Sequence, residues 1–160
     1  MGQSTDGILF FGYCWNSEGW PGVLDEGDEG SSEPDSSPEE AYLERKGLWH
    51  SLPHHSAPGA NYDAWSENLS VLHELEEKLP FELFTHCHHE CQMWAMAIRG
   101  TKITAWRGSP QEIDMASLAV TYNVTSTEVQ QEYDAVLREA CQVLGMKPGK
   151  LGWWLVSNWF

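Results

Sequence analysis

The stretch FELFTHCHHECQMWAMAIRGTKITAWRG, residues 81–108, decides the fold, because strand patterning replaces the helical spacing of the residues before it. Three strands are predicted there: FELFTHC (81–87), QMWAMAI (92–98) and KITAWRG (102–108). Residues 93–98 are apolar on both faces, so the middle strand is expected to be buried on both sides. RGTK at 99–102 has Gly100 at the first central position of a tight turn, which predicts a type II′ hairpin between the last two strands.

Residues outside this region are predicted to add two more strands and two main helices. The strands are nearly continuous apolar runs, and the helices repeat apolar residues every three or four positions along one face. The elements are GILFFGYCW (7–15) and WWLVSNWF (153–160) as strands, and 63–79 and 127–144 as helices. Pro80 follows the first helix and Gly145 follows the second, and both residue types end helices.

Two cap-like segments predict shorter helices. Ser37 begins the segment SPEE, in which Pro38 suits the first helical position and Glu40 completes a capping box. The segment SPQE at 109–112 has a similar form, and it predicts a short helix that ends near Val120.

The order of these elements predicts an α+β fold. A mostly antiparallel sheet of about five strands is expected to carry the two main helices packed on one face. The length of 160 residues fits one domain, so residues 1–160 are predicted to form a single domain. Gly, Ser, Pro and acidic residues dominate 16–38, which predicts an acidic flexible loop inserted after the first strand.

Net charge limits the classes of partner. The chain has 24 acidic and nine basic residues, a formal charge of −15, and residues 18–40 hold nine acids and no lysine or arginine. Surfaces that bind a nucleic-acid backbone carry the opposite charge, so we expect no direct binding to nucleic acid. An acidic surface instead favours a basic protein or nucleoprotein complex as partner.

The acidic loop and its neighbouring tryptophans are predicted to form a partner-binding surface. Nine tryptophans in 160 residues are a high proportion, and most of those in strands are expected in the core. Trp20 and Trp49 lie in predicted loops, where indole rings beside carboxylates suit an arginine- and lysine-rich surface. The predicted partner-binding residues are Asp25, Glu26, Asp28, Glu29, Glu33, Asp35, Trp20 and Trp49.

The segment THCHHEC (85–91) has two interpretations. Cysteine and histidine are the preferred ligands of zinc, and Cys87, Cys91, His86 and His89 are candidate metal ligands. The spacing C-x-x-x-C is loose, however, and a hairpin tip flanked by two small apolar residues fits the same pattern. We therefore expect a polar turn and no cofactor, with a zinc site as the alternative.

Motifs of catalysis and of membrane insertion are missing from the sequence. The chain has neither a G-x-S-x-G elbow nor a Gly-rich phosphate loop, so we expect a protein that is not an enzyme. No run approaches the roughly 18 apolar residues of a membrane helix, and residues 1–15 lack the basic start of a signal peptide. We therefore expect a cytoplasmic protein without membrane contact.

Three segments resemble small uncharacterised proteins from bacteriophage genomes: MGQSTDGILFFGYCW (1–15), THCHHECQMWAMAI (85–98) and WRGSPQEI (106–113). These segments carry no catalytic motif. The resemblance implies only a setting, that of a phage or prophage accessory protein in a bacterial cytoplasm.

Charge and setting together predict a function. An acidic surface can imitate the phosphate charge of DNA and occupy a basic groove. We expect stoichiometric binding that inhibits or modulates a host nucleic-acid-handling or defence complex, as an anti-CRISPR-like or DNA-mimic protein does. Two alternatives remain: a zinc-binding domain or zinc-dependent enzyme that uses 85–91, and a virion or assembly component.

Overall fold

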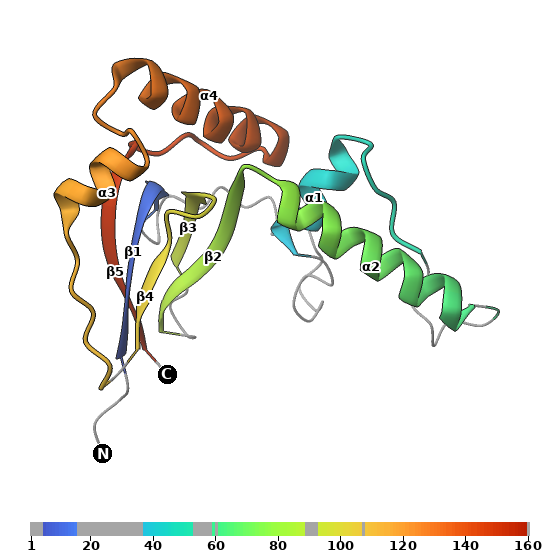
Figure 1. The fold of residues 1–160 in the computed structure, drawn as a ribbon. Coiled ribbons are helices and arrows are strands. Elements are labelled where there is room, and N and C mark those ends of the chain that lie inside the picture. Colours follow the sequence, from blue (N-terminus) through green and yellow to red (C-terminus); the bar gives the residue numbers. More distant parts are fainter. Residues whose placement is uncertain are drawn as a thin grey trace. The chain divides into compact units, whose positions relative to one another are not determined.

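The computed structural model describes residues 5–15, 37–52, 59, 61–88, 93–106 and 108–159. In these residues the chain forms five strands and four helices, which confirms the predicted α+β class (Figure 1). The elements are β1 (Thr5–Cys14), α1 (Pro38–Arg45), α2 (Tyr62–Lys78), β2 (Phe81–His88), β3 (Met93–Ile98), β4 (Ile103–Ala105), α3 (Met115–Thr121), α4 (Thr127–Leu144) and β5 (Gly152–Trp159).

The chain divides into two compact units by its internal contacts, and the predicted single domain stays a prediction. Unit 1 comprises Met1–Gly22 and Pro80–Phe160, and it contains β1 to β5 together with α3 and α4. Unit 2 comprises Val23–Leu79 and contains α1 and α2. Of the two predicted main helices, α4 packs against β1 and β3 of the sheet, and α2 packs against α1 within unit 2.

Unit 1 is built around β1. One edge of β1 pairs antiparallel with β5 from Thr5 to Gly12, and the other edge pairs antiparallel with β4 and then with β3. β3 also pairs antiparallel with β2, whose last residues, Cys87 and His88, pair in parallel with β5. The pairings β1–β3, β3–β2, β2–β5 and β5–β1 therefore close a ring of four strands. The predicted sheet of mostly antiparallel strands is confirmed.

The predicted hairpin between β3 and β4 is wrong. Both strands pair with the same edge of β1, β4 with Gly7–Leu9 and β3 with Gly12–Cys14, so they follow one another instead of lying side by side. The backbone N–H of Thr101 donates to the carbonyl of Ile98 at 3.1 Å, which closes a four-residue turn. Gly100, with a φ of +83°, is the third residue of that turn, where type II geometry requires a positive φ.

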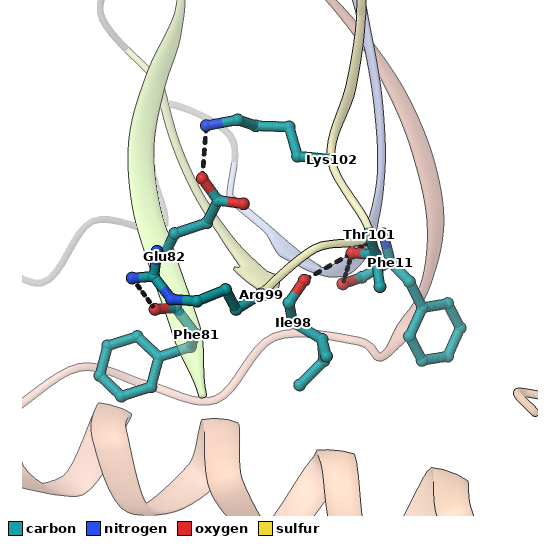
Figure 2. Close-up of polar contacts among 7 residues, drawn as sticks. All are labelled: Phe11, Phe81, Glu82, Ile98, Arg99, Thr101 and Lys102. Carbon is teal, nitrogen blue, oxygen red and sulfur yellow. Dashed lines mark hydrogen bonds and ion pairs between the residues drawn. The ribbon is translucent and has the colours of Figure 1, made fainter. Parts of the chain in front are cut away.

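The buried hydroxyl of Thr101 bridges the interval between β3 and β4. It accepts a hydrogen bond from the N–H of Phe11 in β1 at 3.2 Å and donates to the carbonyl of Ile98 at 2.7 Å (Figure 2). The carbonyl of Phe11 lies 3.3 Å from the same hydroxyl. A side chain thus replaces the backbone bonds that β1 lacks at this point, and a buried polar group of β1 is satisfied.

Alternate residues of β1 face two different cores. On the face covered by α4, Phe11 packs edge-on against Tyr133, with ring centroids 6.1 Å apart. The Tyr13 hydroxyl donates to the Asp134 carboxylate of the same helix. Figure 1 shows α4 crossing the end of the sheet at which β1 finishes. The buried residues of α4 are Leu137, Ala140, Cys141 and Leu144.

The opposite face of β1 carries a smaller core, which we call the inner core. Ile8 and Phe10 pack there with Ala95 and Ala97 of β3. Four partly buried residues complete the inner core: Cys14, Phe84, Trp154 and Val156. The rings of Phe10 and Phe84 meet edge to face, with centroids 5.0 Å apart. The inner core holds the strands of the ring together from within.

Capping residues fix the helix ends. The predicted capping box of α1 is confirmed: the Ser37 hydroxyl accepts from the Glu40 N–H at 3.0 Å, and the Ser37 N–H donates to the Glu40 carboxylate at 3.3 Å. α4 ends at Gly145 as predicted, with a φ of +74°. The predicted cap at Ser109 is wrong, because α3 begins later and the carboxylate of Asp114 accepts from the N–H groups of its first turn.

Candidate functional site

His86 contacts Cys14 of the first strand, a residue outside the predicted metal cluster. His86 is 6% exposed, and its Nε2 atom lies 3.4 Å from Sγ of Cys14. Cys87 has a φ of +74° and pairs with Asn158 of β5. The other two predicted metal ligands lie outside the described residues: His89 and Cys91. The structure therefore brings His86 to a cysteine 72 positions earlier in the chain.

Burial keeps this pair uncharged. It raises the pKa of the Cys14 thiol and lowers the pKa of His86, so each group favours its neutral form at pH 7. A neutral thiol is a weak nucleophile and a weak metal ligand compared with a thiolate. Among the described residues, no three Cys, His, Asp or Glu side chains gather closely enough to hold a metal ion, and the zinc site stays a prediction.

A pocket of about 200 Å³ lies along the first half of β1. Its apolar lining comes from Ile8 and Phe84 of the inner core. Asp6, Lys102 and two threonines supply polar groups, and Trp106 forms part of the wall. Asp6 is 6% exposed whereas Trp106 is 62% exposed, so the pocket joins a buried carboxylate to an indole ring at the surface.

Neighbouring groups already hold Lys102, a basic residue of the pocket. The Nζ atom of Lys102 lies 2.5 Å from Oε2 of Glu82 and 4.8 Å from the centroid of the Phe84 ring. Figure 2 shows this ion pair beside a second link, in which the Arg99 guanidinium donates to the carbonyl of Phe81 at 2.9 Å. Both links join the segment after β3 to β2. The positive charge of Lys102 is therefore shared with Glu82 before any ligand enters.

Acidic residues are concentrated in unit 2. Val23–Leu79 contains fourteen of the 24 acidic residues and three of the nine basic residues, so its formal charge is −11 out of −15 for the chain. Four acids of α2 are exposed along the helix: Asp63, Glu67, Glu74 and Glu77. Lys78 lies 3.8 Å from Glu74, and both side chains are more than 70% exposed, so this ion pair neutralises little of the surface.

Two aromatic rings lie at the start of α2 among these acids. Tyr62, which is 61% exposed, and Trp65 have ring centroids 6.0 Å apart. Asp63 and Glu67 are exposed on the same two turns of the helix. The side chain of Asn61 caps these turns by accepting from the N–H of Asp63 at 3.0 Å. Aromatic rings and exposed carboxylates therefore lie together at the start of α2.

Trp49 is not at the surface, contrary to prediction. It is 5% exposed, and its indole N–H donates to the carbonyl of Asn68 in α2 at 3.3 Å. The side-chain amide of Asn68 in turn donates to the carbonyl of His50 at 3.2 Å, so the segment after α1 is tied to α2. The remaining predicted partner-binding residues lie outside the described residues: Trp20, Asp25, Glu26, Asp28, Glu29, Glu33 and Asp35.

Comparisons with family models, with curated proteins and with solved structures found no match for this chain. In the part of the chain that the structure describes, no helix is both long enough and apolar enough to cross a membrane.

No pattern in the sequence predicts this pocket. Its lining comes from β1, β2 and the segment around β4, which are far apart in the sequence. The available signals are weak ones: Asp6 directly before an apolar strand, and Trp106 directly after another. Neither residue indicates which other strand it will meet.

Proposed function

We propose that this protein acts by stoichiometric binding, and that the acidic surface of unit 2 occupies a basic groove of a nucleic-acid-handling or defence complex. The bound complex is inhibited or modulated, in the manner of a DNA-mimic or anti-CRISPR protein. The observation that carries the proposal is the concentration of negative charge in unit 2: Val23–Leu79 contains fourteen acidic and three basic residues. Such a surface attracts basic partners and repels nucleic acid.

The spacing of the exposed acids of α2 supports a likeness to DNA. Asp63 and Glu77 are fourteen residues apart in one helix, which corresponds to about 21 Å at 1.5 Å per residue. That length is more than half of a turn of duplex DNA, about 34 Å. A groove shaped for a phosphate backbone therefore meets several carboxylates along one helix.

The aromatic pair of α2 adds a contact that charge alone does not give. Tyr62 and Trp65 present ring surface beside Asp63 and Glu67. Arginine side chains stack on such rings while they pair with carboxylates, and aromatic residues are frequent among the residues that dominate interface energies. In the proposed binding surface, Tyr62 and Trp65 replace the buried Trp49 as aromatic contacts.

The proposal also includes the biological setting in which the protein works. The resemblance of residues 1–15, 85–98 and 106–113 to phage proteins supports a phage-encoded accessory protein that works in a bacterial cytoplasm. A basic host protein or nucleoprotein complex is the partner that this setting and the charge of unit 2 favour.

The test compares two variants that lose the same charge in different units. The unit 2 variant is Asp63→Asn, Glu67→Gln, Glu74→Gln and Glu77→Gln. The unit 1 control is Glu112→Gln, Glu128→Gln, Glu132→Gln and Glu139→Gln, all of which are exposed. Each variant has a formal charge of −11 in place of −15. Proteins captured from bacterial lysate at low and high salt are identified, and affinity for the captured partner is then measured by titration.

We expect the unit 2 variant to bind its partner about tenfold more weakly and with a flatter salt dependence, while the control stays near wild type. Duplex DNA should compete with the wild-type protein for the partner. Equal losses in both variants would mean that only net charge matters, and an unchanged affinity in the unit 2 variant would refute the proposal.

A further inference from the structure

Three aliphatic side chains are exposed in unit 2. Leu48, Leu52 and Val71 are 57%, 43% and 46% exposed, whereas leucine and valine are among the residue types most often buried. Single exposed aliphatic residues are common on protein surfaces and need no explanation. Here two of them lie in one short segment, and hydrogen bonds hold that segment against the helix that carries the third. We call these three residues the aliphatic strip.

Hydrogen bonds to α2 place the segment 48–52 beside the helix near Val71. The Trp49 indole donates to the carbonyl of Asn68 at 3.3 Å, and the side-chain amide of Asn68 donates to the carbonyl of His50 at 3.2 Å. Asn68 precedes Val71 by three residues in α2, so the two side chains are neighbours on the helix surface. The segment therefore lies within about one helical turn of Val71.

The other side of the segment is held by α1. The N–H of Ser51 donates to the carboxylate of Glu44 at 3.1 Å. A surface that is fixed on both sides loses little conformational entropy when a partner binds. Arg45 and Lys46 precede Leu48 in the sequence, so this end of the aliphatic strip follows two basic residues.

The opposite end of the aliphatic strip, at Val71, lies among acids. Glu67 is four residues before Val71 and Glu74 is three residues after it, and this spacing makes both carboxylates neighbours of Val71 on the helix surface. Both glutamates are exposed. Lys78 is the lysine of α2, and it lies two turns beyond Val71 in an exposed ion pair with Glu74. An exposed pair of this kind neutralises little charge.

This arrangement selects the chemistry of an occupant. An aliphatic strip with carboxylates along its side is complementary to a helix that carries apolar residues on one face and basic residues beside them. A phosphate backbone would be repelled, and an uncharged apolar helix would cover carboxylates without pairing them. Several classes of DNA-binding protein place a basic helix in the major groove, so a surface that binds such a helix blocks its contact with DNA.

We propose that the aliphatic strip and α2 bind a basic amphipathic helix of the partner, with the apolar face of that helix on Leu52 and Val71 and its basic residues at Glu67 and Glu74. This inference rests on the proposed function, because it names the element of the basic partner that the acidic surface of unit 2 contacts.

The first experiment titrates the full-length protein with three synthetic peptides of about four helical turns. In the first peptide, leucines recur every three or four positions among lysines. The second has alanine in place of each leucine, and the third has the composition of the first in an order that leaves no apolar helical face. Binding is followed by fluorescence anisotropy of the labelled peptides. We expect the first peptide to bind at least tenfold more tightly than the other two. Equal affinities would overturn the proposal.

Two variants of the aliphatic strip test the assigned contacts. Val71→Ser and Leu52→Ser should each weaken binding of the amphipathic lysine–leucine peptide about fivefold and leave binding of the lysine–alanine peptide unchanged. Serine and valine have similar helix propensities, so Val71→Ser leaves α2 folded. The matched control is Val120→Ser, because Val120 is an exposed valine of α3 in unit 1. Unchanged affinity in both strip variants, or an equal loss in the control, would contradict the assigned site.

The unit 2 variant, which lacks four acids of α2, separates the failure of this inference from the failure of the proposed function. Wild-type protein that binds all three peptides equally, together with weaker binding of every peptide by the unit 2 variant, would show recognition by charge alone. The proposed function would then stand and the amphipathic helix would be refuted. A preference for the amphipathic peptide that depends on Val71 supports the inference, and it does so even if the partner captured from lysate binds the unit 2 variant as tightly as wild type.

Discussion

Gly12 lies where β1 has a partner strand on each edge. It pairs with Ala97 of β3 and with Gly152 of β5. A Cβ atom added at Gly12 would lie 2.0 Å from the carbonyl oxygen of Met96 and 2.9 Å from Cα of Ala97. These contacts are with backbone, so no change of rotamer relieves them. We expect Gly12→Ala to lower the free energy of unfolding by about 3 kcal/mol or more, as measured by urea denaturation.

Gly7 provides the matched control in the same strand. A Cβ at Gly7 meets no heavy atom within 4 Å. Alanine is favoured over glycine within a strand by roughly 0.5–1 kcal/mol, so Gly7→Ala should leave stability unchanged or slightly higher. Similar losses from both substitutions would show that general strand propensity, and not the close approach of β3, decides the result.

Single residues also show what a sequence pattern can and cannot predict about a site. Cysteine and histidine in 85–91 are the residue types that ligate zinc, but the cysteine that His86 contacts is Cys14, in another strand. Trp49 lies in a segment that the sequence predicts to be a loop, where an exposed ring is expected. Its indole N–H instead donates to the carbonyl of Asn68, and its ring is buried. Both outcomes depend on tertiary contacts, which leave no periodicity in the sequence.

At the scale of elements, Thr101 joins β3 and β4 into one continuous partner for the same edge of β1. Its hydroxyl satisfies the buried N–H of Phe11, which lies between the two paired segments of β1. Thr101→Val keeps the shape and removes the hydroxyl, so that N–H loses its acceptor. An unsatisfied buried group costs about 1–3 kcal/mol, and we expect Thr101→Val to lower the free energy of unfolding by this amount in urea denaturation.

Thr101→Ser tests whether the hydroxyl is the cause. Serine retains the hydrogen-bonding group and loses only a methyl, so it should recover most of the stability that valine loses. A serine variant that is as unstable as the valine variant would assign the role of Thr101 to packing instead.

Helix ends and strand partners differ in how far the sequence determines them. The capping box at Ser37 and the stop at Gly145 are local signals, and both helix ends were predictable. β4 pairs with residues of β1 that lie 94 to 98 positions earlier in the chain, and the glycine of the turn before β4 fits two turn types. Pairing over such distances carries no local signature, which is why the predicted hairpin failed.

For the whole molecule, the order of the predicted elements indicates the class of fold, and the distribution of acidic residues locates the charge. The acidic excess around 18–40 is visible in the sequence, and the exposed acids of α2 extend it within unit 2. The break between Leu79 and Pro80 has only the proline as a signal, and a proline also ends an ordinary helix. A second compact unit follows from the contacts among α1, α2 and the segment of Trp49.

We expect the two compact units to unfold locally and independently of each other. One core substitution in each unit tests this. Leu43 of α1 is 1% exposed in unit 2, and Leu137 of α4 is fully buried in unit 1. Truncation of either leucine to alanine costs about 2–5 kcal/mol. We expect Leu43→Ala to speed amide hydrogen exchange in α1 and α2 and leave β1 and β5 unchanged, and Leu137→Ala to do the reverse. If either substitution speeds exchange equally in both units, the chain unfolds as one cooperative body, and the acidic surface of unit 2 is then only as stable as the sheet.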